Sequence, residues 1–193
     1  MNLKKFRINQ TLLIEFVSVF LAVFLGFMAN QWRDSYNNSK LAKQTVENIQ
    51  FEIRNNSKTL TGMLANHKVQ QKKIDRLMEI IDDPKATENI TLDLQFKLIS
   101  SNSWETAKLT QAVAYMDVKQ VSDIAAVYEI QEYYKNLVDD FTRSTNVISS
   151  DDVKEAKISL LKIKRALGKI VPMESDLLVY YRELQKKIAK SEE

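Results

Sequence analysis

The chain has 193 residues, with no cysteine, three glycines and two prolines. Its 28 basic and 25 acidic residues leave a formal net charge of +3, without the concentrated basic composition that is typical of nucleic-acid-binding domains. The absence of cysteine excludes disulfides, thiol catalysis and cysteine-ligated zinc. Because glycine and proline are so scarce, we expect an all-α protein with long helices and short connections, and no nucleic-acid partner.

The most apolar segment covers residues 12–29, LLIEFVSVFLAVFLGFMA, and Glu15 is its one charged residue. An eighteen-residue helix is roughly 27 Å long, close to the ~30 Å hydrocarbon core of a bilayer. We therefore expect a transmembrane helix over 12–32, between a basic leader at 1–11 and a helical extramembrane domain at 33–193. Trp32 and Tyr36 lie where interfacial aromatic anchors are found.

Two alternatives to a membrane span remain at this point. A secretory signal peptide has a shorter apolar region of 7–15 residues, and a cut after Ala29 would place the large Phe27 at the −3 position. The other alternative is the buried helix of a soluble protein. Both fit the length and composition of the segment less well than an uncleaved span does.

Positive charge on the two flanks gives an orientation. Lys4, Lys5 and Arg7 precede the span, so the positive-inside rule predicts a cytoplasmic N-terminus. Arg33 and Lys40 follow the span and make this bias modest. The predicted location is the bacterial inner membrane, single-pass, with the bulk of the chain in the periplasm.

The span carries one side chain that breaks the apolar pattern. Glu15 lies about one turn inside it, where a carboxylate either reaches the headgroups or pairs with a neighbouring helix. Ser18, Ala22 and Gly26 form a ridge of small residues at four-residue steps, about 40° from Glu15, and such ridges let a second helix approach closely. The bilayer is thus one expected partner, and a second copy or another membrane protein is the other.

Apolar periodicity predicts the remaining elements. A helix continuous with the span runs to Asp82-Asp83-Pro84, and polar residues at Asn56, His67 and Gln71 give its apolar face a wet middle. Leucine and phenylalanine alternate over 92–98 in a strand-like way, but no partner strand is evident, so we expect a short helix at 91–100. Further helices are expected at 103–115, 117–142, 151–169 and 174–190, with Pro172 separating the last two, and all of them fold back as a bundle.

Residues suited to catalysis are few. His67 is the one histidine, and a helical histidine beside lysines is more typical of a surface or interface than of an active site. No glycine-rich phosphate loop, HExxH or GxSxG motif is present. We therefore expect no enzyme, no cofactor and no metal site.

Two parts of the chain resemble a known family. The first is Glu15, the apolar run and residues 30–32 (NQW), and the second is residues 103–107 (SWETA), 114–116 (AYM) and 133–134 (YY). These resemble the DUF6090-like group of uncharacterised bacterial membrane proteins over about a third of the chain. The resemblance implies a single-pass inner-membrane protein with a helical extramembrane domain, and it implies no activity.

The sequence is compatible with three functions. The favoured one is a membrane-anchored interaction or accessory subunit. The second is a periplasmic ligand-sensing bundle whose pocket is lined by Trp104, Tyr115, Tyr128 and Tyr134, which the short leader disfavours because it leaves no cytoplasmic output domain. The third is an enzyme without a recognisable motif.

Overall fold

The computed structural model describes residues 10–83, 90–145 and 153–191. Its elements, in chain order, are α1 (Gln10–Ile80), α2 (Asn102–Leu109), the 3₁₀ turn η1 (Ala112–Tyr115), α3 (Val118–Thr145) and α4 (Val153–Ser191). Within these ranges the chain forms helices, turns and one extended segment, with no strand. The all-α prediction is confirmed.

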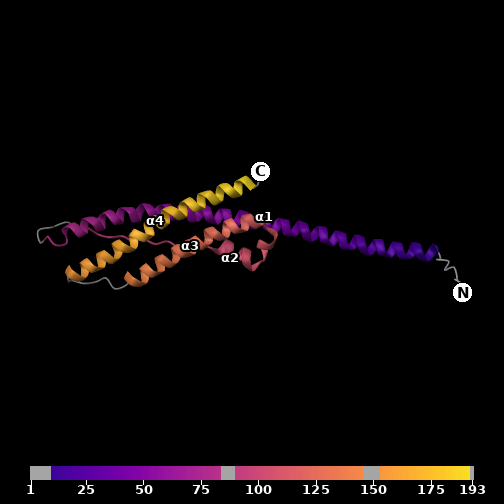
Figure 1. The fold of residues 1–193 in the computed structure, drawn as a ribbon, viewed down its shortest axis with the longest axis horizontal. Coiled ribbons are helices and arrows are strands. Elements are labelled where there is room, and N and C mark those ends of the chain that lie inside the picture. Colours follow the sequence, from indigo (N-terminus) through magenta and orange to yellow (C-terminus); the bar gives the residue numbers. More distant parts are fainter. Residues whose placement is uncertain (1–9, 84–89, 146–152, 192–193) are drawn as a thin grey trace, which may run out of the picture.

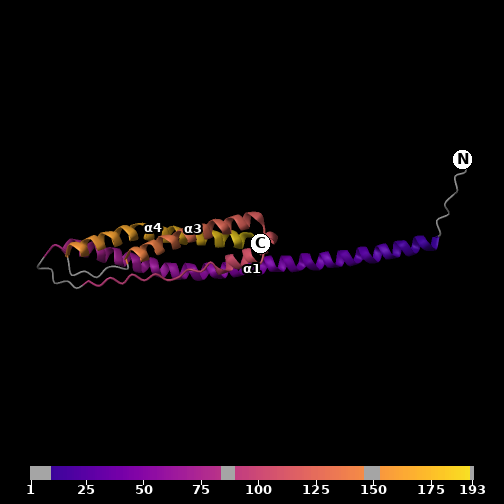
Figure 2. The ribbon, with the colours of Figure 1, turned by 90° about the horizontal axis from the view of Figure 1, so that it is seen from below.

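Helix α1 dominates the molecule. It has 71 residues, about 106 Å at 1.5 Å per residue, and it passes from the apolar segment into the bundle without a break, as expected. Figures 1 and 2 show its N-terminal part projecting alone beyond the other helices. Residues 13–37 are all exposed, and Ala42 is the first buried residue. Roughly 15 Å of helix therefore separates Trp32 from the bundle.

The bundle has four members, one of which is not a helix. Helix α4 packs against both α1 and α3, while an extended segment, residues 90–101, runs on the opposite side between α1 and α3. The ring of Phe96 shows this position, because it lies 4.5 Å from the ring of His67 on α1 and 5.3 Å from that of Phe141 on α3. We call residues 90–101 the strap. It takes the place that a helix has in a regular four-helix bundle.

The short helix expected at 91–100 is therefore wrong. Leu92, Leu94 and Phe96 are half-buried against the core, which is what the alternating pattern indicated. Partners for the strap backbone come from side chains of α1 in place of a second strand. Three side chains donate to strap carbonyls: Lys73 to Thr91 O, His67 Nε2 to Gln95 O and Asn56 Nδ2 to Ser100 O. Three side-chain atoms accept from strap N–H groups: Gln70 Oε1 from Asp93, Met63 Sδ from Lys97 and Asn56 Oδ1 from Ser100.

The break expected between two C-terminal helices is also wrong. Pro172 lies inside α4, which continues to Ser191. A proline in a helix interior costs about 3 kcal/mol, but the residues on either side hold the helix in the core: Leu167, Ile170 and Val171 before it and Leu177 after it are buried. Packing of this apolar face outweighs the lost backbone hydrogen bond.

The helix expected at 103–115 is divided in the structure. Helix α2 ends at Leu109, and Gln111 has a left-handed backbone with φ of 57°. Its N–H donates to Lys108 O in a tight closing turn, after which η1 places Ala112 in the core. The expected start of the next helix is confirmed, because Asp117 Oδ1 accepts the N–H of Gln120 at 3.0 Å, as an N-cap does.

Candidate functional site

The residues predicted to contact another membrane helix lie on the projecting part of α1. Glu15, Ser18, Ala22 and Gly26 are all exposed. The Ser18 hydroxyl donates to Ile14 O at 2.8 Å, so its hydrogen bond is made within the helix. A Cβ added to Gly26 would meet nothing within 4 Å. The small-residue ridge is therefore open to a second helix.

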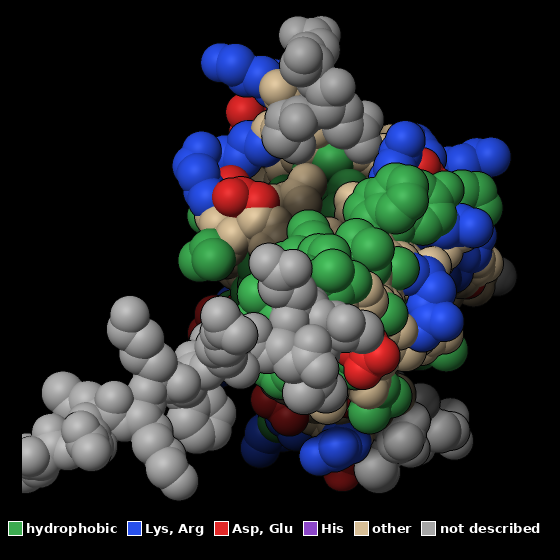
Figure 3. Space-filling model, turned by 90° about the vertical axis from the view of Figure 1, so that its right-hand side faces the viewer, with side chains coloured by type: hydrophobic (Ala, Val, Ile, Leu, Met, Phe, Trp, Pro, Cys, Tyr) green, Lys and Arg blue, Asp and Glu red, His purple; other side chains and the backbone are tan. Residues whose placement is uncertain are grey.

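The apolar segment ends in a polar cluster. Asn30 donates to Asp34 at 3.1 Å and accepts from Arg33 at 2.9 Å. The neighbouring Trp32 is 80% exposed and Tyr36 is 67% exposed. Figure 3 looks along the molecule from this end and shows hydrophobic side chains near the centre, with Lys, Arg, Asp and Glu side chains toward the edge of the view. The exposed aromatic side chains and Arg33 at the end of the apolar segment suit a bilayer interface.

The four aromatic residues considered for a sensing pocket lie at separate places. Trp104 and Tyr128 are buried and stacked, with ring centroids 5.8 Å apart. Tyr134 is buried further along α3, beside Glu174 of α4. Tyr115 is 47% exposed on η1. Three of the four are thus packed core side chains.

Two polar networks replace apolar contacts in the middle of the bundle, and the first is centred on Glu52. Its carboxylate accepts from the Tyr128 hydroxyl at 2.5 Å, the Ser100 hydroxyl at 2.6 Å and the Ser103 N–H at 3.0 Å. Three donors compensate the ionised carboxylate for lost hydration. The network ties α1 to the strap, α2 and α3.

The Glu52 network extends through two amides. Asn56 Nδ2 and Gln131 Nε2 both donate to Ser100 O, at 2.7 and 2.8 Å. Gln131 Oε1 accepts from the Tyr181 hydroxyl at 2.5 Å, which brings α4 into the same layer. Asn56, Ser100, Gln131 and Tyr181 lie on α1, the strap, α3 and α4. Their hydrogen bonds therefore fix how these four elements are aligned along the bundle.

The second network is centred on His67 and Glu174, both fully buried. His67 Nδ1 lies 2.8 Å from Glu174 Oε1, which also accepts from the Tyr134 hydroxyl at 3.0 Å. His67 Nε2 lies 3.2 Å from Gln95 O. Since a carbonyl only accepts, Nε2 carries a proton, and one further proton is shared between Nδ1 and Oε1. The expectation that His67 belongs to a surface or interface is wrong.

Sequence reasoning missed the acidic members of both networks. Glu52 and Glu174 resemble ordinary solvated glutamates in the sequence, whereas the wet middle expected at Asn56 and His67 is present. A signal for Glu52 exists in its position, because it falls one turn before Asn56 on the same face of α1. Glu174 carries a similar signal, because it falls between Ile170 and Leu177 at steps of four and three, but the break expected at Pro172 divided this stripe.

Burial in these networks changes the acidity of three phenols. Burial, together with the hydrogen bond and charge of Glu52, raises the pKa of Tyr128 well above its usual 10. Burial and the nearby Glu174 charge raise the pKa of Tyr134 in the same way. The pKa of Tyr181 is raised by burial, partly opposed by the amide of Asn56.

Both networks consist of hydrogen bonds between side chains and backbone groups of the bundle. Within the described ranges, no group of three or more histidine, aspartate or glutamate side chains converges on a metal-sized site. The polar atoms of both networks bond to one another inside the bundle. Their arrangement fits a structural role.

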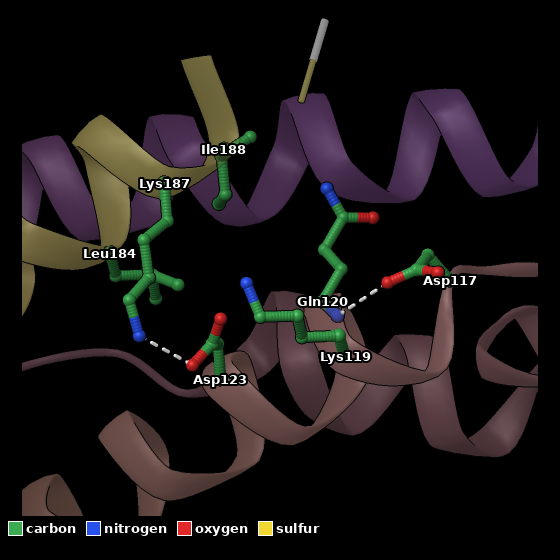
Figure 4. Close-up of a pocket in the computed structure, with 7 residues that line it drawn as sticks. All are labelled: Asp117, Lys119, Gln120, Asp123, Leu184, Lys187 and Ile188. Carbon is green, nitrogen blue, oxygen red and sulfur yellow. Dashed lines mark hydrogen bonds and ion pairs between the residues drawn. The ribbon is translucent and has the colours of Figure 1, made fainter. Parts of the chain in front are cut away.

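Two clefts lie along the α3–α4 seam. The one at the α3 N-terminus has a volume of about 70 Å³ and is crossed by the Lys187–Asp123 ion pair at 2.6 Å (Figure 4). This is room for a few water molecules. The other, at the far end of the seam, has about 390 Å³. It is lined by Leu137, Asp140, Phe141, Ser144, Lys162, Arg165, Ala166, Lys169 and Ile170, and we call it the α3–α4 groove.

A third cleft of about 860 Å³ lies between α1 and the turn at η1, near the projecting helix. Its lining mixes acidic, basic and apolar side chains, including Lys43, Glu47, Tyr115 and Asp117.

Comparison with protein-family models, with curated proteins and with solved structures gave no match.

Proposed function

We propose that the chain is a membrane-anchored interaction or accessory subunit, in which a single span carries a rigid helical bundle. The observation that carries this proposal is the exposure of every residue from 13 to 37 on a helix that continues directly into the bundle. This helix contains a segment long and apolar enough to cross a membrane. Apolar side chains exposed on all sides of a helix suit lipid as their solvent.

The interior of the bundle supports an interaction role over ligand sensing. Trp104, Tyr128 and Tyr134 fill the core, and the hydroxyls of the two tyrosines donate to Glu52 and Glu174. The clefts that remain are on the surface, between helices, where a protein partner has access. A surface that presents a groove outside the membrane favours partner binding.

The location and orientation belong to the same proposal. Lys4, Lys5 and Arg7 support a cytoplasmic N-terminus, which puts the bundle in the periplasm of a bacterial inner membrane. The resemblance to the DUF6090-like group supports the same arrangement. A homo-oligomer through the small-residue ridge, or a second membrane protein there, is the proposed partner within the bilayer.

Membrane extraction and topology reporters test this proposal. We expect the full chain to resist alkaline carbonate extraction, and a periplasm-active reporter fused after Lys43 to be active. A reporter fused at the same site but active only in the cytoplasm is the matched control, and it should be silent. Release by carbonate would contradict the anchor, and a cytoplasmic signal after Lys43 would reverse the orientation.

A further inference from the structure

The α3–α4 groove brings three cations of α4 together beside an apolar floor. Lysines of α4 that face α1 are paired: Lys164 lies 2.7 Å from Asp75, and Lys157 pairs with Asp82. Lys162, Arg165 and Lys169 line the groove and make no ion pair with any described residue. Helix α4 thus pairs Lys157 and Lys164 with α1 and Lys187 with α3, whereas the three cations of the groove have no ion pair among the described residues.

The groove has an apolar floor between these cations. Leu137 and Phe141 of α3 face Ala166 and Ile170 of α4 across it. Phe141 and Ile170 are buried and the other two are half-buried. Asp140 is the one acidic residue in the lining, so the rim is predominantly positive.

The spacing of the lining residues matches a helix. On α3 they recur at 137, 140, 141 and 144, and on α4 at 162, 165, 166, 169 and 170, steps of three and four that put each set on one face. Two such parallel stripes form the groove into which the side chains of a third helix interdigitate. The length covered is about two helical turns.

The distance of the groove from the apolar segment favours a protein over the membrane as the occupant of the groove. Gln71 of α1 donates to Leu167 O of α4 at 3.2 Å, which places the groove level with residue 71. That is roughly 58 Å beyond Trp32 along α1, far outside a bilayer whose polar region ends within about 8 Å of the hydrocarbon. Lipid headgroups of the anchoring membrane do not reach it.

We propose that the α3–α4 groove binds an acidic amphipathic helix of a partner protein, with apolar side chains on the groove floor and carboxylates toward Lys162, Arg165 and Lys169. This rests on the proposed interaction function and names the partner's chemistry. Helix-in-groove recognition combines an apolar stripe for affinity with flanking charges for specificity.

The test uses the full chain in non-ionic detergent and two labelled synthetic helices of about 21 residues. Both carry leucine on one face, and they differ in having glutamate or lysine on the flanks. Fluorescence anisotropy reports binding. We expect the acidic helix to bind the wild type and the basic helix to bind at least about tenfold more weakly, from three exposed charge contacts.

Charge reversal is the decisive comparison. The variant K162E/R165E/K169E should lose about tenfold in affinity for the acidic helix and gain affinity for the basic one. The control K58E/K68E/R182E makes the same change in net charge at exposed positions outside the groove lining, and should stay within about twofold. Ala166→Trp, which fills the floor, should weaken both helices, and circular dichroism checks that each variant is folded.

Three results would overturn the proposal. One is equal binding of both helices, or an acidic-helix affinity that K162E/R165E/K169E leaves unchanged. The second is binding to phosphatidylglycerol vesicles but to neither helix. The third is wild-type self-association, measured by light scattering, that the triple variant abolishes, because the occupant is then a second copy. Failure of the membrane anchor is separate, since carbonate extraction does not depend on these three residues.

Discussion

The two carboxylates in the bundle core are balanced in different ways. Glu52 accepts hydrogen bonds from three donors, two of them uncharged side chains. Glu174 depends on His67 and Tyr134 for its Oε1, while its Oε2 is buried without a hydrogen-bond partner among the described residues. A buried carboxylate in this position is sensitive to the loss of a single neighbour.

Replacing His67 with leucine should therefore destabilise the bundle by about 3–5 kcal/mol, because it leaves Glu174 buried and unpaired. The double variant His67→Leu with Glu174→Leu should recover most of that loss, since both polar groups are gone. Urea unfolding followed by circular dichroism measures both. A double variant no more stable than the single one would contradict the pairing.

The three buried phenols predict an alkaline limit to stability. Their pKa values are raised in the folded protein, while the unfolded chain releases these protons near the usual pKa of 10. Above pH 10 the unfolded state thus binds fewer protons than the folded one, and stability falls as pH rises. Below pH 10 the three phenols contribute no pH dependence.

The expected slope is up to about 4 kcal/mol per pH unit above pH 10, from three groups at about 1.4 each. Replacing Tyr128, Tyr134 and Tyr181 with phenylalanine should flatten it. The same change at Tyr133 and Tyr180, which are 57% and 45% exposed, serves as the control. Urea titrations between pH 8 and pH 11, as a rough range set by the phenol pKa, measure the slope.

Among the elements, the strap depends most on single side chains. Asn56 holds it in the manner of a strand, accepting from Ser100 N at 2.9 Å and donating to Ser100 O at 2.7 Å. Asn56→Ala removes both bonds inside a buried layer, and should cost about 2–4 kcal/mol. It should also increase cleavage by trypsin after Lys97.

Lys73 provides a control on the same ladder. Its ammonium donates to Thr91 O at 3.0 Å at an exposed position, where a hydrogen bond contributes little because water replaces it. Lys73→Ala should change stability by less than about 1 kcal/mol and leave trypsin cleavage after Lys97 unchanged. Equal effects of the two substitutions would show that Asn56 does not hold the strap.

The strap and α4 show which parts of the fold the sequence predicts. Alternation at Leu92, Leu94 and Phe96 correctly indicated extended chain, but single-sequence reasoning looks for a strand as the partner. The α1 side chains that bond the strap backbone recur with the spacing of a helix face, so nothing in the sequence marks them as partners of an extended segment. At Pro172 the local rule is overridden by tertiary packing, which depends on where α1 and α3 lie.

On the scale of the whole molecule, the sequence predicts the long helix α1 but does not predict the groove on the surface of the bundle. The sequence alone predicts a helix apolar and long enough to cross a membrane, together with its continuation, because apolar length is a local property. The α3–α4 groove exists only once α3 and α4 are aligned. Lys162, Arg165 and Lys169 resemble a solvated face in the sequence, and their place beside the apolar floor of the groove is what sets them apart.

The projecting helix leads to a prediction about assembly. Gly26 has open space where a Cβ would be, and Ser18 and Ala22 continue the same ridge, so two spans can approach closely there. For the proposed homo-oligomer, Gly26→Leu should disrupt this contact and lower the mass of the detergent-solubilised protein to that of a monomer. Glu15→Gln should weaken it less, because an amide still forms a hydrogen bond across the helices.

Light scattering in detergent and cysteine cross-linking at Ala22 measure the two species. Val17→Leu is the matched control, since residue 17 lies about 180° from residue 26 and about 140° from residue 22 around the helix, on the face away from the ridge. It should leave the dimer fraction unchanged. If Gly26→Leu and Val17→Leu give the same mass as the wild type, the apolar segment makes no close helix contact, and assembly depends on the bundle alone.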